Sequence, residues 1–355
     1  MNFRGELALK FTIQIANQYT VPELVRLARL GHAEGFTQVW VNDNLCQRNL
    51  FVVISAMAAQ VPIKLGTSIV VPYFRNPVDV ADTLAALSEL TQGRELSVGI
   101  ARGDLTRAGR QVDMRKPITM VRELTLAIQA LLAGEEIIFR DYPAIAEYHH
   151  IRPQQEFRLA FSPAAPVRFY CGGNGPRILK IAGEIMDGAI IGNYYIPLVR
   201  AGRLDSLLAI ARGAANARQP AKTLFDVCEL DVSISRDRQL ALRFAKPYVA
   251  HILMALEFMG FSHDEYRAMD IEPGLINSLK DAFAGGATLQ SVAPLIPDDT
   301  VTSCFVAGGP EECRDQIAEL IEEAERLEFG QIAFAKLGPD YDEAIELLRR
   351  KVLPS

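Results

Sequence analysis

The sequence predicts an α/β fold, a (β/α)8 TIM barrel with insertions after strands 4 and 7, formed by a single domain over residues 1–355. Eight short apolar runs have the length of strands, and stretches with one apolar helical face separate them. Repeated strand–helix units imply parallel strands joined by right-handed crossovers. Eight such units fit a closed barrel better than an open sheet, and barrels of this length form single domains.

Strand and helix candidates alternate through the first half of the chain. Gly35, Gly93 and Gly134 each follow an apolar helical pattern, and glycine is the usual residue just after a helix end. Thr20 and Glu23 have the spacing of a capping box. The predicted strands are Leu7–Ala16, Thr37–Val41, Lys64–Val71 and Glu95–Ala101. The predicted helices begin at Thr20, Asn49, Asn76 and Lys116, and the second and fourth end at Gln60 and Ala133.

The alternation continues in the second half. Pro176 stands in the first turn of a predicted helix, where the fixed φ of proline is favourable. The predicted strands are Val167–Cys171, Ala189–Gly192, Val227–Ser235 and Gln331–Lys336. The predicted helices are Pro176–Ile185, Leu198–Ala217, the strongly amphipathic Pro310–Arg326, and Tyr341–Val352.

Three segments do not fit the repeat. Gly103–Arg115 is a polar loop after the fourth strand, about 137–166 forms an irregular insertion, and about 240–299 forms a long, mostly helical insertion. Loops that follow barrel strands build the active face, so these segments are candidates for a lid or a substrate pocket. The alternative is that they only cover the barrel or form a contact between subunits.

Composition excludes several classes of protein. The net charge is −6 with no basic block, so we expect no nucleic-acid partner. No apolar run has the length of a membrane span, and residues 1–10 lack the features of a signal peptide. The five cysteines are scattered without a C-x-x-C pair, and the histidines show no metal-ligand spacing. We therefore expect a cytoplasmic protein with reduced thiols, no metal and a small-molecule substrate.

The clearest local motif is the glycine-rich run Cys171–Arg177, which joins a strand to a helix. Glycines allow close approach of a ligand to the backbone, and the free amides of a helix N-terminus attract an anion. The run lacks the G-K-[ST] of a Walker A loop and the G-x-G-x-x-G of a dinucleotide fold. It therefore predicts a phosphate site, with a simple tight turn as the alternative.

Three further polar clusters follow predicted strands. Asn42, Asp43 and Asn44 follow the second strand and are able to bind the edge of a ligand, or to form an ordinary turn. Gly66–Pro72 places Gly66, Thr67 and Ser68 at the end of the third strand, where small residues leave room for a flat ligand. The alternative is an ordinary strand end that proline stops. Gly99–Asp104 follows the fourth strand and has the same two interpretations.

Five blocks stand out in order along the chain: Trp40–Asn49, Lys64–Pro77, Leu87–Arg94, Val98–Asp104 and Gly172–Gly188. Together they resemble the luciferase-like superfamily, and within it the coenzyme F420-dependent methylene-tetrahydromethanopterin reductases. Their order and spacing are far more specific than any one block. The resemblance implies a barrel, usually dimeric, that holds F420, or alternatively FMN, at the carboxyl ends of its strands.

The resemblance also assigns site residues. It implies a cis peptide bond between Ser68 and Ile69, behind the cofactor ring and next to Thr67. The cofactor phosphate is expected at Gly172, Gly173, Asn174 and Gly175. Asp43 and Asp104 match two acidic positions of the family.

Two positions depart from the family pattern. A histidine commonly follows the first of these aspartates, and here Asn44 stands there; a glutamate of the reductases corresponds to Gln14. An amide keeps the hydrogen bonding of an acid but has no titratable proton. The catalytic candidates are thus Asp43, Asn44, Gln14 and Asp104, with proton donation from Asp104, an insertion histidine or water.

Three functions follow as hypotheses. The first is hydride transfer between reduced F420 and a methylene-tetrahydropterin-like or other small organic substrate. The second is an FMN-dependent monooxygenase that uses reduced flavin and oxygen. The third is a degenerate protein that binds a cofactor without catalysis, for which Gln14 and Asn44 are the reason. The same barrel supports both enzyme functions, so the fold does not decide between them. Direct use of a nicotinamide cofactor on this barrel is a further possibility.

Overall fold

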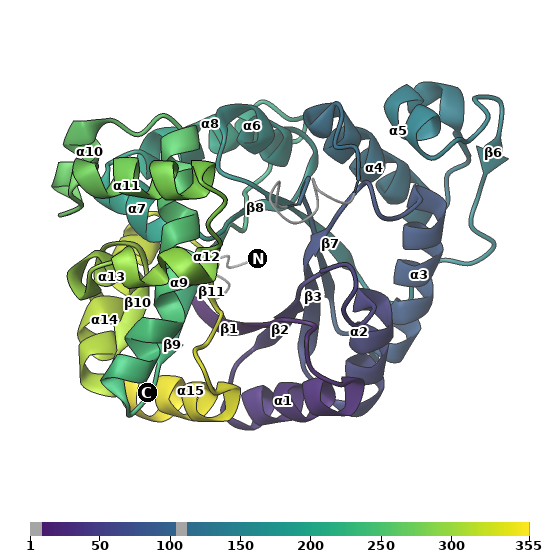
Figure 1. Ribbon diagram of the computed structural model, residues 1–355. Coiled ribbons are helices and arrows are strands. Elements are labelled where there is room, and N and C mark those ends of the chain that lie inside the picture. Colours follow the sequence, from purple (N-terminus) through teal and green to yellow (C-terminus); the bar gives the residue numbers. More distant parts are fainter. Residues whose placement is uncertain (1–8, 104–111, 355) are drawn as a thin grey trace. The chain divides into compact units, whose positions relative to one another are not determined.

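The structure is a computed structural model that describes residues 9–103 and 112–354, and its strands form a (β/α)8 barrel (Figure 1). The sheet order is β10-β9-β11-β1-β2-β3-β4-β7-β8, and β9 also pairs with β8, so eight of the strands form a closed parallel barrel. These eight are β1 (Lys10–Ile15), β2 (Gln38–Val41), β3 (Lys64–Val70), β4 (Leu96–Ile100), β7 (Val167–Gly172), β8 (Gly188–Ile191), β9 (Val227–Ile234) and β11 (Gln331–Ala335). Each overlaps a predicted strand, and the predicted fold class is confirmed.

The described residues pack as two compact units. Unit 2 consists of residues 12–190 and 208–227, and it contains β2, β3, β4 and β7. Unit 1 consists of residues 9–11, 191–207 and 228–354, and it contains β10 (Val306–Gly308) and β11.

The helices of unit 2 follow the predicted alternation. They include α1 (Val21–Ala33), α2 (Leu50–Gln60), α3 (Pro77–Leu90), α4 (Pro117–Leu132) and α6 (Pro176–Ile185). Figure 1 shows α1 to α4 outside β2, β3 and β4. Asn49 and Asn76 cap α2 and α3 through their side chains, which satisfies amides that the helix itself leaves unpaired. The capping box predicted at Thr20 is wrong, because Glu23 pairs with Arg26 and Thr20 makes no capping bond.

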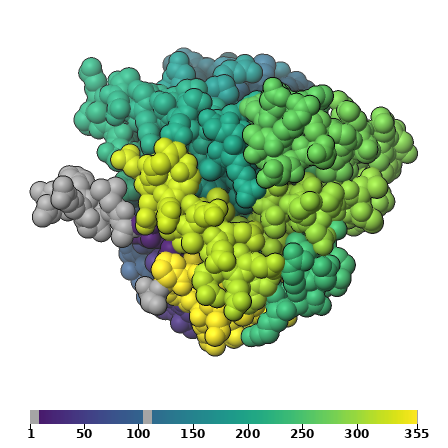
Figure 2. All heavy atoms as spheres, turned by 90° about the vertical axis from the view of Figure 1, so that its left-hand side faces the viewer, coloured from purple at the N-terminus to yellow at the C-terminus, as the bar shows by residue number. Residues whose placement is uncertain are grey.

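The helices of unit 1 come largely from the second insertion. They are α7 (Tyr195–Arg200), α9 (Arg238–Phe258), α10 (His263–Ala268), α11 (Pro273–Ala284), α12 (Leu289–Val292), α13 (Asp298–Cys304), α14 (Pro310–Arg326) and α15 (Tyr341–Leu347), with short 3-10 and π turns at Ala293–Leu295 and Leu348–Val352. Residues 240–299 are thus mostly helical, as predicted. Figure 2 shows α10 and α11, in green, on the outer surface of this unit. Within the two described ranges, no helix is long and apolar enough to cross a membrane.

Two elements differ from the sequence prediction. The helix predicted over 198–217 is two helices, α7 and α8 (Leu204–Asn216), because the chain turns at Gly202 with φ +66°. A side chain rarely adopts that φ, so the glycine allows the break. Strand β10 was not predicted, since three residues are too few to show an alternating pattern.

The core of unit 2 explains one glycine that the sequence assigned to ligand binding. Trp40 is 1% exposed and packs edge-on against Tyr170, with ring centroids 5.6 Å apart. A Cβ at Gly66 would lie 2.5 Å from Cε3 of Trp40. Gly66 therefore makes room for a core indole, and this part of the Gly66–Pro72 prediction is corrected.

Within unit 1, Arg203 binds the turn between α9 and α10 and the start of α10. Its guanidinium binds the Glu265 carboxylate, with Nη2 to Oε2 at 2.7 Å, and donates to the Gly260 carbonyl at 3.0 Å. It also lies 4.0 Å from the ring centroid of Phe261. Glu265 in turn accepts the amide of Ser262 and closes a capping box at the start of α10. Hydrogen bonding from Arg203 is the largest cause that lowers the pKa of Glu265, from 4.5 to about 2.

We expect the Glu265→Gln protein to lose about 1–3 kcal/mol of unfolding free energy at pH 7, since this carboxylate is mostly shielded from solvent. Because the folded pKa is depressed, the contribution is complete above pH 4.5 and disappears as the pH falls to about 2. Thermal melting of the parent and the variant between pH 7 and pH 2.5 measures this. The Asp264→Asn control removes a carboxylate that is 92% exposed and should melt like the parent. Parallel acid profiles for the parent and Glu265→Gln would contradict the assignment.

Candidate functional site

The predicted phosphate loop lies between β7 and α6 in unit 2. Gly173 has φ +149°, which favours glycine, and its amide donates to the Ile190 carbonyl at 3.2 Å. Gly175 is the N-cap of α6 and has no side chain to supply a capping oxygen, and the first turn holds no acidic residue. The positive end of this helix is therefore directed at whatever occupies the loop.

Helix α14 provides an internal comparison. Like α6, which starts at Gly175-Pro176, it begins with a glycine followed by a proline, Gly309-Pro310. There, however, Glu312 turns back and its Oε2 accepts the Gly309 amide at 3.0 Å. The helix start is thus neutralised by the chain's own carboxylate in α14, whereas α6 carries Arg177 and Ile178 at the positions of Glu311 and Glu312. This difference favours an external anion at α6.

An apolar surface adjoins the loop. The bond between Ser68 and Ile69 is cis, as the resemblance implied, and the Asn42 side chain donates to the Ser68 carbonyl at 3.0 Å. Ile69 is half-buried between buried neighbours of β3. A Cβ at Gly99 or at Gly172 would lie 2.9 Å or 3.2 Å from Cγ2 of Ile69. These glycines therefore let the Ile69 side chain occupy the space beside β4 and β7.

The buried Thr67 side chain links the end of β3 to β4. Its hydroxyl donates to the Gly99 carbonyl at 3.1 Å, and Thr67 is 2% exposed. The predicted cofactor residues thus form two adjacent parts, an apolar surface at Ile69 and a glycine loop with unneutralised helix amides. That donor set fits a flat ring joined to a phosphate. Direct ligand contact by each residue stays a prediction.

Asp43, a predicted catalytic residue, is one partner of a buried ion pair. Its Oδ1 and Oδ2 accept from Nη2 and Nε of Arg75 at 2.7 and 3.2 Å, and the two side chains are 2% and 13% exposed. The guanidinium also lies 4.9 Å from the Phe51 ring centroid. The pair ties the segment after β2 to the segment after β3. Sequence reasoning missed Arg75, although it lies inside the Lys64–Pro77 block.

We expect Arg75→Met to cost about 3 kcal/mol of unfolding free energy, because it leaves the Asp43 carboxylate buried without its counter-charge. Restoring neutrality in Arg75→Met/Asp43→Asn should recover part of the loss. Arg115→Met, which removes a guanidinium that is 53% exposed, is the matched control and should change the melting temperature little. A melting temperature for Arg75→Met equal to that of the control would disprove a role for this pair in stability.

The other predicted catalytic residues lie in different surroundings. Gln14 is 4% exposed in β1, in register with Trp40 of β2. Asn44 is partly exposed and donates to Gln47, while its carbonyl accepts the side-chain amide of Asn17 at 3.2 Å. Asp104 lies outside the described residues. Asn17, which no motif singled out, holds the segment after β2 because it also donates to the Arg48 carbonyl.

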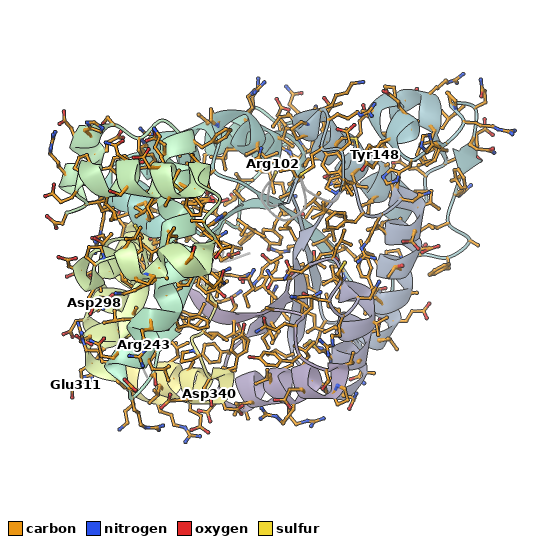
Figure 3. All side chains as sticks on the ribbon, in the orientation of Figure 1. Arg102, Tyr148, Arg243, Asp298, Glu311 and Asp340 are labelled. Atoms are coloured by element: carbon orange, nitrogen blue, oxygen red, sulfur yellow. The ribbon has the colours of Figure 1, made fainter. Side chains whose placement is uncertain are left out.

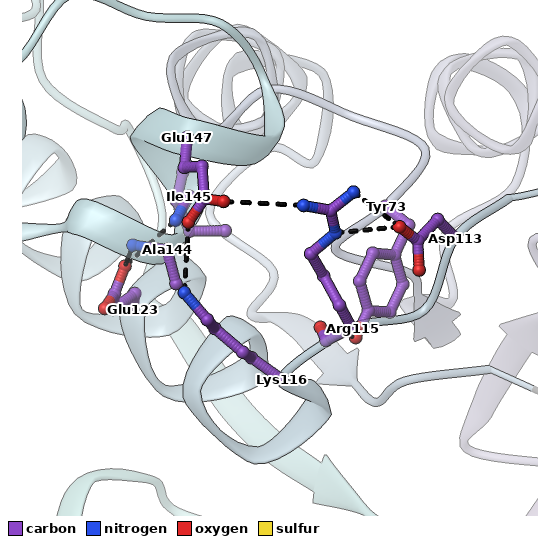
Figure 4. Close-up of polar contacts among 8 residues, drawn as sticks. All are labelled: Tyr73, Asp113, Arg115, Lys116, Glu123, Ala144, Ile145 and Glu147. Atoms are coloured by element: carbon purple, nitrogen blue, oxygen red, sulfur yellow. Dashed lines mark hydrogen bonds and ion pairs between the residues drawn. The ribbon is translucent and has the colours of Figure 1, made fainter.

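The first insertion packs against the loops that follow β3 and β4. Its short helix α5 (Pro143–Tyr148) is capped by Glu123 of α4, whose Oε2 accepts the Ala144 and Ile145 amides (Figure 4). The Glu147 carboxylate forms ion pairs with Arg115 and Lys116, which precede α4. The segment is thus more regular than predicted, since it also contains the antiparallel pair β5 (Ile137–Ile138) and β6 (Glu156–Phe157).

Aromatic residues continue this contact toward β3. Nε2 of His149 lies 2.9 Å from the Pro72 carbonyl, and Tyr148 packs edge-on against Tyr73 at 5.1 Å. The Tyr73 hydroxyl donates to the Arg115 carbonyl at 2.8 Å. Burial lowers the pKa of His149. Figure 3 shows Tyr148 and Arg102; Arg102 is exposed and lies two residues after the end of β4. The insertion therefore supports the loops beside the candidate site.

A hollow of about 720 Å3 lies in unit 1 and contains none of the predicted site residues. Its lining carries both charges: Arg238 binds Glu312 at 2.7 Å, and Asp298 binds Lys246 at 2.7 Å. The positive and negative charges within these two pairs neutralise each other. We therefore place the candidate site at Ile69 and the glycine loop rather than in this hollow.

Two solved enzymes share the fold of this chain. The solved coenzyme F420-dependent tetrahydromethanopterin reductase of Methanopyrus kandleri has a TM-score of 0.75 at 22% identity, covering 97% of this chain and 98% of that chain. The oxygenating constituent of 3,6-diketocamphane monooxygenase from Pseudomonas putida, solved with FMN, has a TM-score of 0.61 at 16% identity, covering 98% and 99%. At these identities the likeness concerns the fold alone.

Sequence comparison gives the family. The chain is 27% identical to the 5,10-methylenetetrahydromethanopterin reductase of Methanolobus tindarius over 362 aligned residues, 97% of this chain and 100% of that protein. The model of the luciferase-like monooxygenase family matches residues 7–326. The chain therefore belongs to the luciferase-like monooxygenase family, and it is an oxidoreductase of that class.

Proposed function

We propose that the protein is an F420-dependent oxidoreductase that transfers a hydride between reduced F420 and a small substrate of the methylene-tetrahydropterin type. The observation that carries the proposal is the N-terminus of α6, which no carboxylate of its own first turn neutralises, next to the half-buried Ile69. The full-length similarity to a methylenetetrahydromethanopterin reductase supports F420 and this substrate class.

The chain's own residues would bind and orient the cofactor. Gly172, Gly173, Asn174 and Gly175 would surround the phosphate, and backbone amides in the first turn of α6 would bind it at the positive end of that helix. The Gly173 amide itself already donates to the Ile190 carbonyl. Ile69 would support one face of the ring. A reduced deazaflavin, when bound, supplies the hydride, so the protein's main contribution is proximity and orientation.

The predicted catalytic residues limit proton transfer. Gln14 and Asn44 are amides, which donate hydrogen bonds but hold no titratable proton. Both oxygens of Asp43 already accept from Arg75, and we assign Asp43 to positioning the loops after β2 and β3. A proton that the substrate requires would come from Asp104, from another side chain, or from water.

A second candidate function is an FMN-dependent monooxygenase. The family model and the FMN-bound structural neighbour favour it, because the same barrel serves that chemistry there. Both cofactors combine a flat ring with a phosphate, so the glycine loop fits either. Binding and oxygen uptake distinguish the two.

Titration of the purified protein with F420 and with FMN, followed by fluorescence and visible absorption, tests the proposal. We expect tight F420 binding, no FMN binding, and anaerobic oxidation of reduced F420 by methylene-tetrahydromethanopterin. FMN binding with substrate-dependent oxygen uptake would establish the monooxygenase instead. F420 binding without turnover of any tested acceptor would leave a cofactor-binding protein, and binding of neither cofactor would overturn the assignment.

A further inference from the structure

A cluster of polar side chains in unit 1 has no role in the function proposed so far. Lys336 directly follows the last residue of β11, a barrel strand, and its Nζ lies 4.0 Å from Oδ1 of Asp231 in β9. The Asp231 side chain is 3% exposed and that of Lys336 is 25% exposed. The ammonium is therefore held at a buried acid while part of its side chain reaches solvent.

The backbone at this point is held in an uncommon conformation. Lys336, Leu337 and Gly338 have φ values of +65°, +62° and +110° in succession. The Leu337 amide donates to the Ala335 carbonyl at 2.8 Å, which closes a three-residue turn centred on Lys336. Turns of this kind with positive φ are rare and strained, and such strain concentrates at functional sites. This strained turn sets the position of Lys336, whose Nζ lies near Asp231.

Helix α9 of the second insertion provides the wall beside the lysine. Nζ of Lys336 lies 5.4 Å from the ring centroid of Tyr248, which stacks on Phe305 with centroids 6.1 Å apart. Phe244, Tyr248 and His251 are all half-buried and are spaced by four and three residues, so they share one helical face.

Pro247 lies inside α9, directly before Tyr248, and removes the helical bond to the carbonyl of Arg243, a residue labelled in Figure 3. One hydrogen bond of this continuous helix is thus absent just before Tyr248, the residue that meets Lys336.

The charges of the cluster indicate the kind of group it would bind. Oδ1 of Asp231 accepts no hydrogen bond from the described residues. Burial raises the pKa of Asp231, and the charges of Lys336 and His251 act in the opposite direction. Because one carboxylate already faces the ammonium, an anionic ligand would add a second, uncompensated negative charge. A neutral carbonyl oxygen, with an adjacent flat ring against Tyr248, fits better.

We propose that Lys336, supported by Asp231 and Tyr248, is a substrate-binding residue that donates a hydrogen bond to the carbonyl oxygen of a pterin-type ring. The inference rests on the proposed function for the substrate class. It assigns the second insertion to the substrate, since α9 supplies the aromatic wall. Pterin binding is measured here without cofactor, so its failure is distinct from a failure of F420 binding.

The test is anaerobic calorimetric titration of the cofactor-free protein with tetrahydromethanopterin and with tetrahydrofolate, which share the pterin carbonyl. We expect Lys336→Met to weaken binding of at least one pterin by about 10- to 100-fold, the loss typical of a hydrogen bond from a charged donor. Lys351→Met, an exposed lysine on the C-terminal turn, is the matched control and should bind like the parent.

A double variant separates substrate binding from charge balance. Lys336→Met alone leaves the buried Asp231 carboxylate without its counter-charge and should lower the melting temperature. Lys336→Met/Asp231→Asn removes both charges with little change of shape, so its melting temperature should return to that of the parent. If Lys336 contacts substrate, pterin binding stays weak in the double variant while F420 affinity is unchanged. Recovery of pterin affinity would mean that Lys336 only balances Asp231, and this would overturn the proposal. Failure of the parent protein to bind either pterin would overturn it as well.

Discussion

The Asn174→Asp protein will bind F420 about 10- to 100-fold more weakly than the parent, because the substitution places a negative charge beside the proposed phosphate. Two like charges about 5 Å apart at an effective dielectric constant of about 20 repel by roughly 3 kcal/mol, and salt reduces this to roughly 1–3 kcal/mol. The side chains of Asn and Asp have nearly the same shape, so the comparison isolates charge. Fluorescence titration with F420 at two ionic strengths measures the affinity of both proteins. The difference in affinity between the parent and Asn174→Asp should be smaller at high salt.

A control separates this local effect from a change in net charge. Asn277→Asp makes the same substitution on the exposed face of α11, in unit 1, and should leave F420 affinity unaltered. Arg177→Glu gives α6 the residue that α14 carries at the same position, Glu311, and should weaken binding like Asn174→Asp. Parent-like affinity in both loop variants would place the phosphate elsewhere.

The Gly183→Ala protein should lose about 4–5 kcal/mol of unfolding free energy, at the upper end for one added methyl group. A Cβ at Gly183 would lie 2.0 Å from the Ala211 carbonyl oxygen and 2.7 Å from Cβ of Ala214. Backbone cannot move aside as a side chain can, so α6 and α8 would have to separate. Thermal melting measures the loss. Because α6 carries the phosphate loop at its other end, F420 affinity should also fall at temperatures where the variant remains folded.

Gly213 of α8 is the matched control for this substitution. Nothing lies within 4 Å of a Cβ built there, and the residue is inside a helix. Alanine is the better helix former, so Gly213→Ala should stabilise the protein by about 0.5–1 kcal/mol. A loss for Gly213→Ala as large as that for Gly183→Ala would show that both act through helix propensity or the unfolded chain rather than through the contact with Ala211.

Parts of the site could be predicted because their signals are local. The run Gly172–Gly175 directly precedes Pro176, so the strand end, the glycines and the helix start all lie within a few consecutive residues. The cis bond at Ser68 was expected only from the family resemblance, because no pattern of residues specifies it. Both expectations concern neighbours in the chain, for which sequence distance and spatial distance agree.

Other parts could not be predicted because they join distant residues. The partner of Asp43 is Arg75, 32 positions later, and the sequence offers several cations for that role. Lys336 meets Asp231 and Tyr248 only after β9, α9 and β11 have packed. Gly66, assigned to a ligand from its position, instead accommodates Trp40. In each case the deciding fact is which side chain fills a particular space.

By itself, then, the sequence determined the eight strands, the helices between them and the glycine loop, because periodicity and turn chemistry act over a few residues. Only the tertiary structure decided that α14 neutralises its own N-terminus while α6 does not, that Asp43 is bound by Arg75, and that Lys336 is directed at Tyr248. These depend on the approach of side chains in three dimensions, where differences of an ångström decide whether a charge is paired or presented to a ligand.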